Sequence, residues 1–264
     1  MFTSYYNLKG EPFGKSLKKE ELFRSSPLKE FSSRMEYMKQ HRGIILLMGA
    51  AGVGKTTALR AFIEELKPEF YKPVYLPLAT VSTPEFYQQL NKTLGGEKMS
   101  RKAALFASIQ GAIMDYATVK KQIPVIIFDE AHFQKSENLH ELQMLLNFNM
   151  DSVDPAIVAL CGQPHLREIL ERSMFSAINQ RFRLKYEFLP LGKTETGEYI
   201  RHHLKTVGAS PQLFNENAID AIYSISSGVM RVINNLATKA LFYSAGKRQD
   251  TITEETIFTV SSEL

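Results

Sequence analysis

Residues Gly49–Thr56, written GAAGVGKT, match the pattern G-x-x-x-x-G-K-[ST] in full. In such a loop the glycines let successive backbone N–H groups turn toward phosphate oxygens, and a helix that begins at the lysine adds its positive end. We expect Lys55 to reach the β- and γ-phosphates of a nucleotide, and the Thr56 hydroxyl to ligate Mg²⁺. The predicted nucleotide contacts of the loop are Gly49, Ala50, Ala51, Gly52, Val53, Gly54, Lys55, Thr56 and Thr57.

Two carboxylates, Asp129 and Glu130, follow the apolar run 124–128. At the carboxyl end of a parallel strand, Asp129 would lie beside the phosphate-binding loop and hold Mg²⁺ through its water shell. Glu130 would then polarise a water molecule for attack on the γ-phosphate. An isolated pair of this kind is more often a solvated strand end. Together with the loop, it predicts a catalytic site for ATP hydrolysis with ATP and Mg²⁺ as ligands.

Short apolar runs alternate with amphipathic segments around these motifs and must position them. Buried strands that alternate with helices are typical of an α/β fold with a parallel sheet covered on both faces. The predicted strands are 43–48, 74–78, 124–128, 156–161 and 184–188, and the predicted helices between them are 55–66, 84–94, 102–119 and 139–148.

The strand pattern stops after Pro190, and four helical patterns follow at 194–207, 215–226, 230–246 and 253–260. We therefore predict three parts in the chain. An N-terminal segment, 1–42, carries one amphipathic stretch around 28–40 and packs near the nucleotide site. An α/β ATPase domain covers 43–190, and a small all-helical lid domain covers 191–264, with a hinge expected near 189–193.

Composition limits the class of protein. With 44% hydrophobic and 23% charged residues, the chain is globular, and its net charge of +4 leaves open both ordinary solubility and a nucleic-acid surface. The single cysteine, Cys161, excludes an internal disulfide and a cysteine-based zinc cluster, which favours a reducing compartment. The sequence contains no signal-peptide pattern and no apolar run long enough to cross a bilayer, so we expect a cytoplasmic protein without a membrane partner.

The run IIFDEAH at 126–132 contains the letters of a helicase motif, but a helicase needs a second ATP-binding domain, and the residues after His132 predict a strand pair followed by helices. Three later segments resemble the ExeA-type AAA+ ATPases instead: GQPHL at 162–166, NQRF at 179–182 and SSGVMRVINN at 226–235. The N-terminal YNL at 6–8 and EPF at 11–13 resemble the start of the same group. The resemblance implies a P-loop AAA+ fold, a parallel sheet flanked by helices and followed by a helical lid.

The resemblance also implies roles for four side chains. Gln163 stands in the position of the polar γ-phosphate sensor, and Arg231 in that of the second sensor. Arg181 stands where an arginine finger would project into the neighbouring subunit's nucleotide, with Arg183 as the alternative. Each has a plain structural interpretation as well: a strand-end glutamine, surface arginines and a helix-start arginine. A finger that acts in trans implies heterologous contacts, which generate a ring or a helical filament.

Proteins of the group that this chain resembles have two known kinds of function. Secretion ATPases carry a membrane span and a periplasmic cell-wall-binding region, which we do not expect here. The free-standing core is similar to the transposition regulators of phage Mu and of Tns-type transposons, which assemble on double-stranded DNA with ATP and select targets for a transposase. The resemblance thus implies DNA, a transposase and further copies of the chain as partners. A secretion ATPase and a nucleotide-dependent scaffold without nucleic acid remain as alternatives.

Candidate DNA contacts lie between the second and third predicted strands. The chain resembles initiator-type AAA+ proteins, which place DNA-contacting residues in this region, and the resemblance implies phosphate contacts here. Such contacts carry no sequence information. The candidates are Lys98, Arg101, Lys102, Lys120 and Lys121, with a solvated helix face as the plain interpretation.

Overall fold

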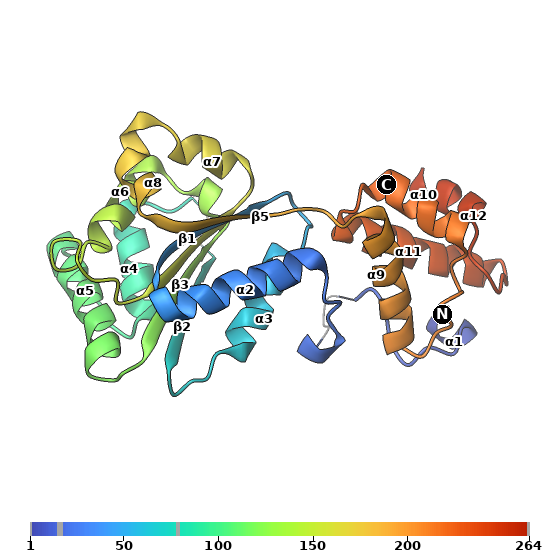
Figure 1. The fold of residues 1–264 in the computed structure, drawn as a ribbon, viewed down its shortest axis with the longest axis horizontal. Coiled ribbons are helices and arrows are strands. Elements are labelled where there is room, and N and C mark those ends of the chain that lie inside the picture. The colour runs from blue at the N-terminus through green and yellow to red at the C-terminus, as the bar shows by residue number, and fades with distance from the viewer. Residues whose placement is uncertain (1, 15–17, 78–79, 263–264) are drawn as a thin grey trace. The chain divides into compact units, whose positions relative to one another are not determined.

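A computed structural model describes residues 2–14, 18–77 and 80–262. These residues form two compact units, which are visible as separate groups of elements in Figure 1. The sheet unit comprises Phe31–Ala51 and Lys55–Phe188. The helical unit comprises Gly52–Gly54 together with the described residues of 1–30 and 189–264. The structure therefore divides the predicted N-terminal segment 1–42 between the two units.

The sheet contains five parallel strands in the order β2-β3-β4-β1-β5. Parallel pairing places all carboxyl ends on one edge, where motifs that follow different strands can meet. The strands are β1 Gly43–Gly49, β2 Tyr71–Pro77, β3 Ile123–Asp129, β4 Ile157–Gly162 and β5 Phe182–Phe188. This arrangement confirms the predicted parallel sheet.

Both faces of the sheet are covered, as the nearly continuous burial of β1, β3 and β4 requires. Alternate residues of β1 point to opposite faces: Ile44, Leu46 and Met48 join the core built with α4 (Thr83–Thr93), α5 (Lys102–Thr118) and α6 (Ser136–Leu145), whereas Ile45 and Leu47 face away from it. On that second face lie α2 (Ser26–His41) and α3 (Lys55–Glu65), whose Phe31 and Phe62 rings are 6.2 Å apart.

The helices of the sheet unit follow the strands in order. They are α2 Ser26–His41, whose first turn belongs to the helical unit, α3 Lys55–Glu65, α4 Thr83–Thr93, α5 Lys102–Thr118, α6 Ser136–Leu145, α7 His165–Leu170 and α8 Ser176–Gln180, with short 3₁₀ turns η2 Ala131–Phe133 and η3 Ser173–Phe175.

The helical unit buries its own apolar core. Its elements are α1 Phe2–Tyr5, the 3₁₀ turn η1 Lys19–Glu21, α9 Lys193–Thr206, α10 Glu216–Ser226, α11 Met230–Gly246 and α12 Glu254–Ser261. Phe2 and Phe13 from the N-terminus belong to this core, together with Ile200 of α9 and Leu236 of α11. These two aromatic anchors explain why the start of the chain groups with α9–α12.

Most predicted elements are confirmed, with shifts of a few residues at their ends. The largest differences lie in β2 and α6. Strand β2 begins at Tyr71, before Pro73, although proline disfavours a strand interior, because β2 is at one end of the strand order and needs a hydrogen-bonding ladder on one side only. The predicted residue Leu78 lies outside the described residues. Helix α6 begins and ends three residues before the predicted 139–148, and α7 and α8 were not predicted.

Burial of His203 in the helical unit predicts a loss of stability in acid. Its side chain is buried beside the rings of Phe13 and Tyr199, and among the described residues Nδ1 has no hydrogen-bond partner. This burial lowers the pKa of His203 from 6.5 to about 4. Between these pH values His203 takes up a proton in the unfolded chain but not in the folded unit. The free energy of unfolding therefore falls as the pH falls, by about 3 kcal/mol once the pH is below both pKa values.

We expect denaturant unfolding of His203→Phe to show a smaller decline between pH 6.5 and pH 4 than unfolding of the wild type. Phenylalanine fits the aromatic surroundings and does not take up a proton. The exposed His41 serves as a control, and His41→Gln should keep the wild-type decline. Equal declines for wild type and His203→Phe would contradict the assignment.

Candidate nucleotide-binding site

Three chain segments with polar functions meet at the carboxyl edge of the sheet. β1 ends at Gly49 and leads into the phosphate-binding loop, β3 ends at Asp129, and β4 ends at Gly162. The register pairs Met48 with Gly162 and Phe128 with Leu160, so the three ends lie at about the same height. The sheet topology thus brings together side chains that are far apart in sequence.

Lys55 is the buried cation of this edge. It begins α3, is 5% exposed, and its Nζ donates hydrogen bonds to the carbonyls of Gly49 at 2.8 Å and Ala50 at 2.9 Å. A buried ammonium that is held by the loop's own carbonyls, and not by a carboxylate, keeps its positive charge uncompensated there. Such a cation fits the position predicted for contact with phosphate.

The loop needs glycine at two positions. Gly52 and Gly54 have φ values of +86° and +95°, in the left-handed region that side chains disfavour. Within the helical unit, to which Gly52–Gly54 belong, the Gly52 carbonyl accepts a hydrogen bond from the Arg231 N–H at 3.1 Å. A Cβ on Gly52 would lie 2.7 Å from that of Arg231. Arg231, in the first turn of α11, therefore lies beside a loop residue, while its role as a sensor stays a prediction.

Asp129 is the buried carboxylate of the edge and is 3% exposed. Its Oδ2 accepts a hydrogen bond from Tyr75 Oη at 2.7 Å and lies 3.4 Å from the Thr56 hydroxyl oxygen. Thr56 and Asp129, the predicted magnesium ligands, thus face the same small space. Tyr75 of β2 was not predicted, because no motif marks it and only the register of β2 on β3 brings it there. Burial raises the pKa of Tyr75, and the hydrogen bond to Asp129 raises it further, so the phenol stays protonated.

Glu130 lies at a sharp turn directly after β3. Its φ of 52° and ψ of 36° are left-handed, and its N–H donates to Asp129 Oδ1 at 2.9 Å. The turn points the side chain out of the sheet edge, where it is 44% exposed. A non-glycine residue in this region is uncommon and costs conformational energy, and such strain is concentrated at functional sites. The predicted water-polarising carboxylate is therefore accessible to solvent.

His132 connects Glu130 to the end of β4. Its side chain is fully buried on η2, Nδ1 lies 3.3 Å from the Gln163 backbone N, and Nε2 lies 3.4 Å from Glu130 Oε2. Burial lowers the pKa of His132, and the opposing effect of Glu130 is smaller. Gln163 itself is half-buried beyond Gly162, at the place predicted for a γ-phosphate sensor.

These residues fit a nucleotide with Mg²⁺. A buried lysine, a loop with the required glycines, and a threonine hydroxyl close to a buried carboxylate provide one cation for phosphate and two oxygen ligands for a hard metal ion. No protein cation neutralises Asp129 among the hydrogen bonds and ion pairs of the described residues, so the negative charge is available to a metal ion.

A family model described as AAA domain matches residues 38–170, half of the chain, which include the phosphate-binding loop, Asp129, Glu130 and Gln163. The chain belongs to the AAA domain family. The chain is 27% identical over 249 residues to General secretion pathway protein A of Aeromonas hydrophila, and the match covers 91% of this chain but only 44% of that protein.

Solved structures confirm the fold. The ORC2 protein of Aeropyrum pernix, in ADPNP and ADP complexes, is similar with a TM-score of 0.69 at 16% identity, covering 97% of this chain and 72% of that one. The ORC1 protein of Aeropyrum pernix in complex with DNA is similar with a TM-score of 0.67 at 15% identity, covering 97% and 69%. At such identities the likeness concerns the fold alone.

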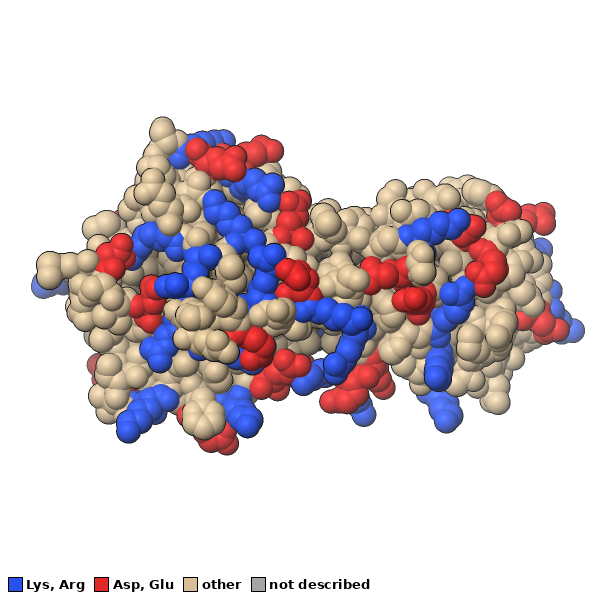
Figure 2. All heavy atoms as spheres, viewed as in Figure 1, with Lys and Arg blue, Asp and Glu red and all other residues tan. Residues whose placement is uncertain are grey.

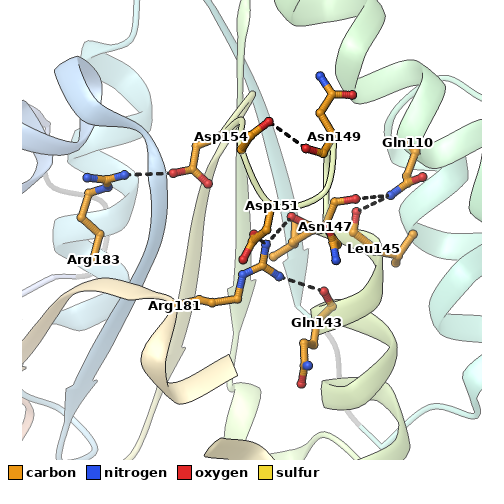
Figure 3. Close-up of polar contacts among 11 residues, drawn as sticks. Gln110, Gln143, Leu145, Asn147, Asn149, Asp151, Asp154, Arg181 and Arg183 are labelled. Carbon is orange, nitrogen blue, oxygen red and sulfur yellow. Dashed lines mark hydrogen bonds and ion pairs between the residues drawn. The ribbon is translucent and has the colours of Figure 1, made fainter. Parts of the chain in front are cut away.

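Both candidate arginine fingers are held by contacts within the sheet unit, as Figure 3 shows. Arg181 donates to the carbonyls of Gln143 at 3.1 Å and Leu146 at 2.9 Å and pairs with Asp151, while Arg183 pairs with Asp154 at 2.9 Å. A pocket of about 410 Å³ adjoins Arg181, lined by Gln143, Met144, Asn147, Asp151, Ala177, Gln180 and Arg181. A finger role for either arginine stays a prediction.

The five DNA candidates lie at the two ends of α5 and do not form one group. Lys98, Arg101 and Lys102 lie at its start, and Lys120 and Lys121 lie beyond its end, about 25 Å away for a helix of 17 residues. Lys102 contacts Glu141 at 2.5 Å and Lys120 contacts Asp115 at 2.9 Å. Among the described residues, Lys98 and Arg101 are exposed and form no salt bridge.

On one face of the sheet unit, Figure 2 shows basic and acidic side chains interspersed. The net charge of +4 is therefore not gathered there into an uninterrupted basic surface. In the part of the chain that the structure describes, no helix combines the length and apolar character that crossing a membrane requires.

Proposed function

We propose that this protein hydrolyses ATP with Mg²⁺. In its ATP state it would assemble on double-stranded DNA in the cytoplasm and select targets for a transposase. The observation that carries the ATPase part is the meeting of a buried Lys55, the Thr56 and Asp129 pair, and the accessible Glu130 at one sheet edge. The DNA part rests on the transposition-regulator resemblance of the sequence and on exposed cations.

The chain's own residues divide the chemistry among them. Lys55 and the loop N–H groups would bind the phosphates, with Lys55 exchanging its carbonyl partners for phosphate oxygens. Thr56 and Asp129 would hold Mg²⁺, which offsets phosphate charge when bound. Glu130 would orient a water molecule and accept its proton, because its carboxylate, unlike that of the buried Asp129, remains in contact with solvent.

DNA binding is supported by the similarity in fold to an ORC1 protein that was solved with DNA. Lys98 and Arg101 are the better candidates for phosphate contacts, because both are exposed and free of salt bridges among the described residues. Lys102 and Lys120 would first have to leave Glu141 and Asp115. Self-assembly would use Arg181 or Arg183 in trans, after release from their present partners.

The test is ATP-dependent assembly on linear duplex DNA, followed by electron microscopy and by binding titrations at several salt concentrations. We expect rings or filaments with ATP or a slow analogue, and none with ADP. Lys98→Ala combined with Arg101→Ala should lower the log-log salt slope by about 2, since each lost phosphate contact contributes about 0.9. Lys205→Ala, at an exposed cation of α9, is the control. Absence of DNA-bound assemblies with ATP would overturn the DNA part alone.

A secretion-type ATPase is the second candidate, because General secretion pathway protein A of Aeromonas hydrophila is similar over most of this chain. In that case ATP hydrolysis would persist without any DNA binding, and a protein of the cell envelope would take the place of DNA. The binding titrations, with ATP turnover measured in the presence and absence of duplex, distinguish the two candidates, since a secretion-type ATPase should bind no duplex and show equal turnover in both conditions.

A further inference from the structure

The ring of His132 has a fixed hydrogen-bonding direction. Nδ1 lies 3.3 Å from the backbone N of Gln163, and a backbone N–H can only donate. Nδ1 must therefore accept, and a neutral imidazole then carries its hydrogen on Nε2. The structure thus assigns the tautomer from the chemistry of the partner.

The other nitrogen of the ring faces Glu130. Nε2 lies 3.4 Å from Glu130 Oε2, and it has no hydrogen-bond partner among the described residues. Because the His132 side chain is fully buried, water cannot readily replace a missing acceptor. The Glu130 side chain is 44% exposed and its Oε2 is already 3.4 Å from Nε2, so a small movement of the side chain would make its carboxylate the acceptor.

The ring of His132 packs closely against Gly162 at the end of β4. A Cβ on Gly162 would lie 3.2 Å from His132 Nδ1 and 2.8 Å from Leu166. The ring is further held between its neighbours, with the centroids of Phe133 at 4.1 Å and His165 at 4.6 Å. His132 therefore packs directly against the end of β4.

We propose that His132 is a positioning residue for ATP hydrolysis, which holds the Glu130 carboxylate through Nε2–H while Nδ1 anchors the ring to Gln163. The proposal rests on the proposed ATPase function. It links the water-polarising carboxylate to the strand end at which Gln163 is predicted to sense the γ-phosphate. A shift of that strand end would then change the orientation of Glu130.

Two amide substitutions separate the two hydrogen bonds. His132→Asn places an oxygen near the Nδ1 position and keeps the bond to Gln163, but it has no group that reaches Glu130. His132→Gln places a donor near the Nε2 position and restores the bond to Glu130. His132→Phe keeps the ring packing without either bond. His140→Gln is the matched control, since His140 stacks on Phe175 away from this edge.

We expect His132→Asn and His132→Phe to lower kcat about tenfold or more, in the range seen when supporting hydrogen bonds of a site are lost. Their affinity for Mg²⁺ and a fluorescent ATP analogue and their melting temperatures should stay near wild type. His132→Gln should recover most of the lost kcat. Wild-type turnover in His132→Asn and His132→Phe, or an equal loss in all three variants, would overturn the proposal.

Two further measurements keep this inference separate from the proposed function. The ring-nitrogen chemical shifts of His132 should show a protonated Nε2 and an unprotonated Nδ1 without any nucleotide, and the opposite tautomer would overturn it. If His132 acts only through Glu130, adding His132→Asn to Glu130→Gln should lower kcat no further. An inactive wild type would refute the proposed ATPase, while the chemical shifts would still test the hydrogen bonds.

Discussion

Replacing Lys55 should abolish nucleotide binding. Lys55 is 5% exposed and its ammonium donates hydrogen bonds to two loop carbonyls, so it is a buried cation that a triphosphate would meet at this edge. Loss of charge-assisted hydrogen bonds worth about 1.5–3 kcal/mol each should weaken binding by about a hundredfold or more. Titration of a fluorescent ATP analogue with Mg²⁺ would measure the effect in Lys55→Ala and in Lys55→Met, which keeps most of the aliphatic stem.

The control is Lys67→Ala, at an exposed lysine soon after the end of α3. It should bind nucleotide as the wild type does. Melting temperatures would show whether the Lys55 variants remain folded, since the lysine also ties the loop to itself through Gly49 and Ala50. A folded Lys55→Met protein with wild-type affinity would refute the assigned phosphate contact.

Replacing Glu130 with glutamine should keep binding and stop hydrolysis. Glutamine has nearly the same shape and preserves the left-handed turn, but its amide cannot accept the proton of the attacking water. We expect kcat to fall by about 10²–10⁴, the usual contribution of a general base. Phosphate release under saturating ATP would give kcat, and the analogue titration would show affinity within about twofold of wild type.

The exposed Glu137 of α6 offers the matching control, because Glu137→Gln changes the same chemical group outside the sheet edge. Its turnover should equal that of the wild type. Normal turnover in Glu130→Gln would show that another group activates the water. The proposed positioning of Glu130 by His132 would then have no role in hydrolysis.

The elements around the nucleotide site could be predicted because each carries a local signal. The run 43–48 is apolar throughout and is followed by glycine, lysine and threonine at fixed spacing, so both β1 and the loop are marked in the sequence. The catalytic roles of Asp129 and Glu130 could be predicted because the same sequence contains that loop. Tyr75 and the orientation of His132 could not be predicted in this way, because both depend on which strands are neighbours and in which register.

The start of the chain and the DNA candidates show a second kind of limit. The buried Phe2 and Phe13 pack with helices near the other end of the sequence, and composition gives no sign of such long-range contacts. The cations around α5 belong to one short region of the sequence, but a helix of 17 residues separates Lys102 from Lys120 in space. Pairing with Glu141 and Asp115 likewise becomes visible only in three dimensions.

The prolines of β2 restrict how copies of this chain can associate. Pro73 and Pro77 are four positions apart, so both direct their backbone nitrogen to the same side of the strand, and that side must be the outer one because the inner side forms the ladder with β3. The outer side of β2 therefore lacks two N–H donors and is a poor template for an added strand. A filament of this protein should therefore grow without extending its sheets across β2.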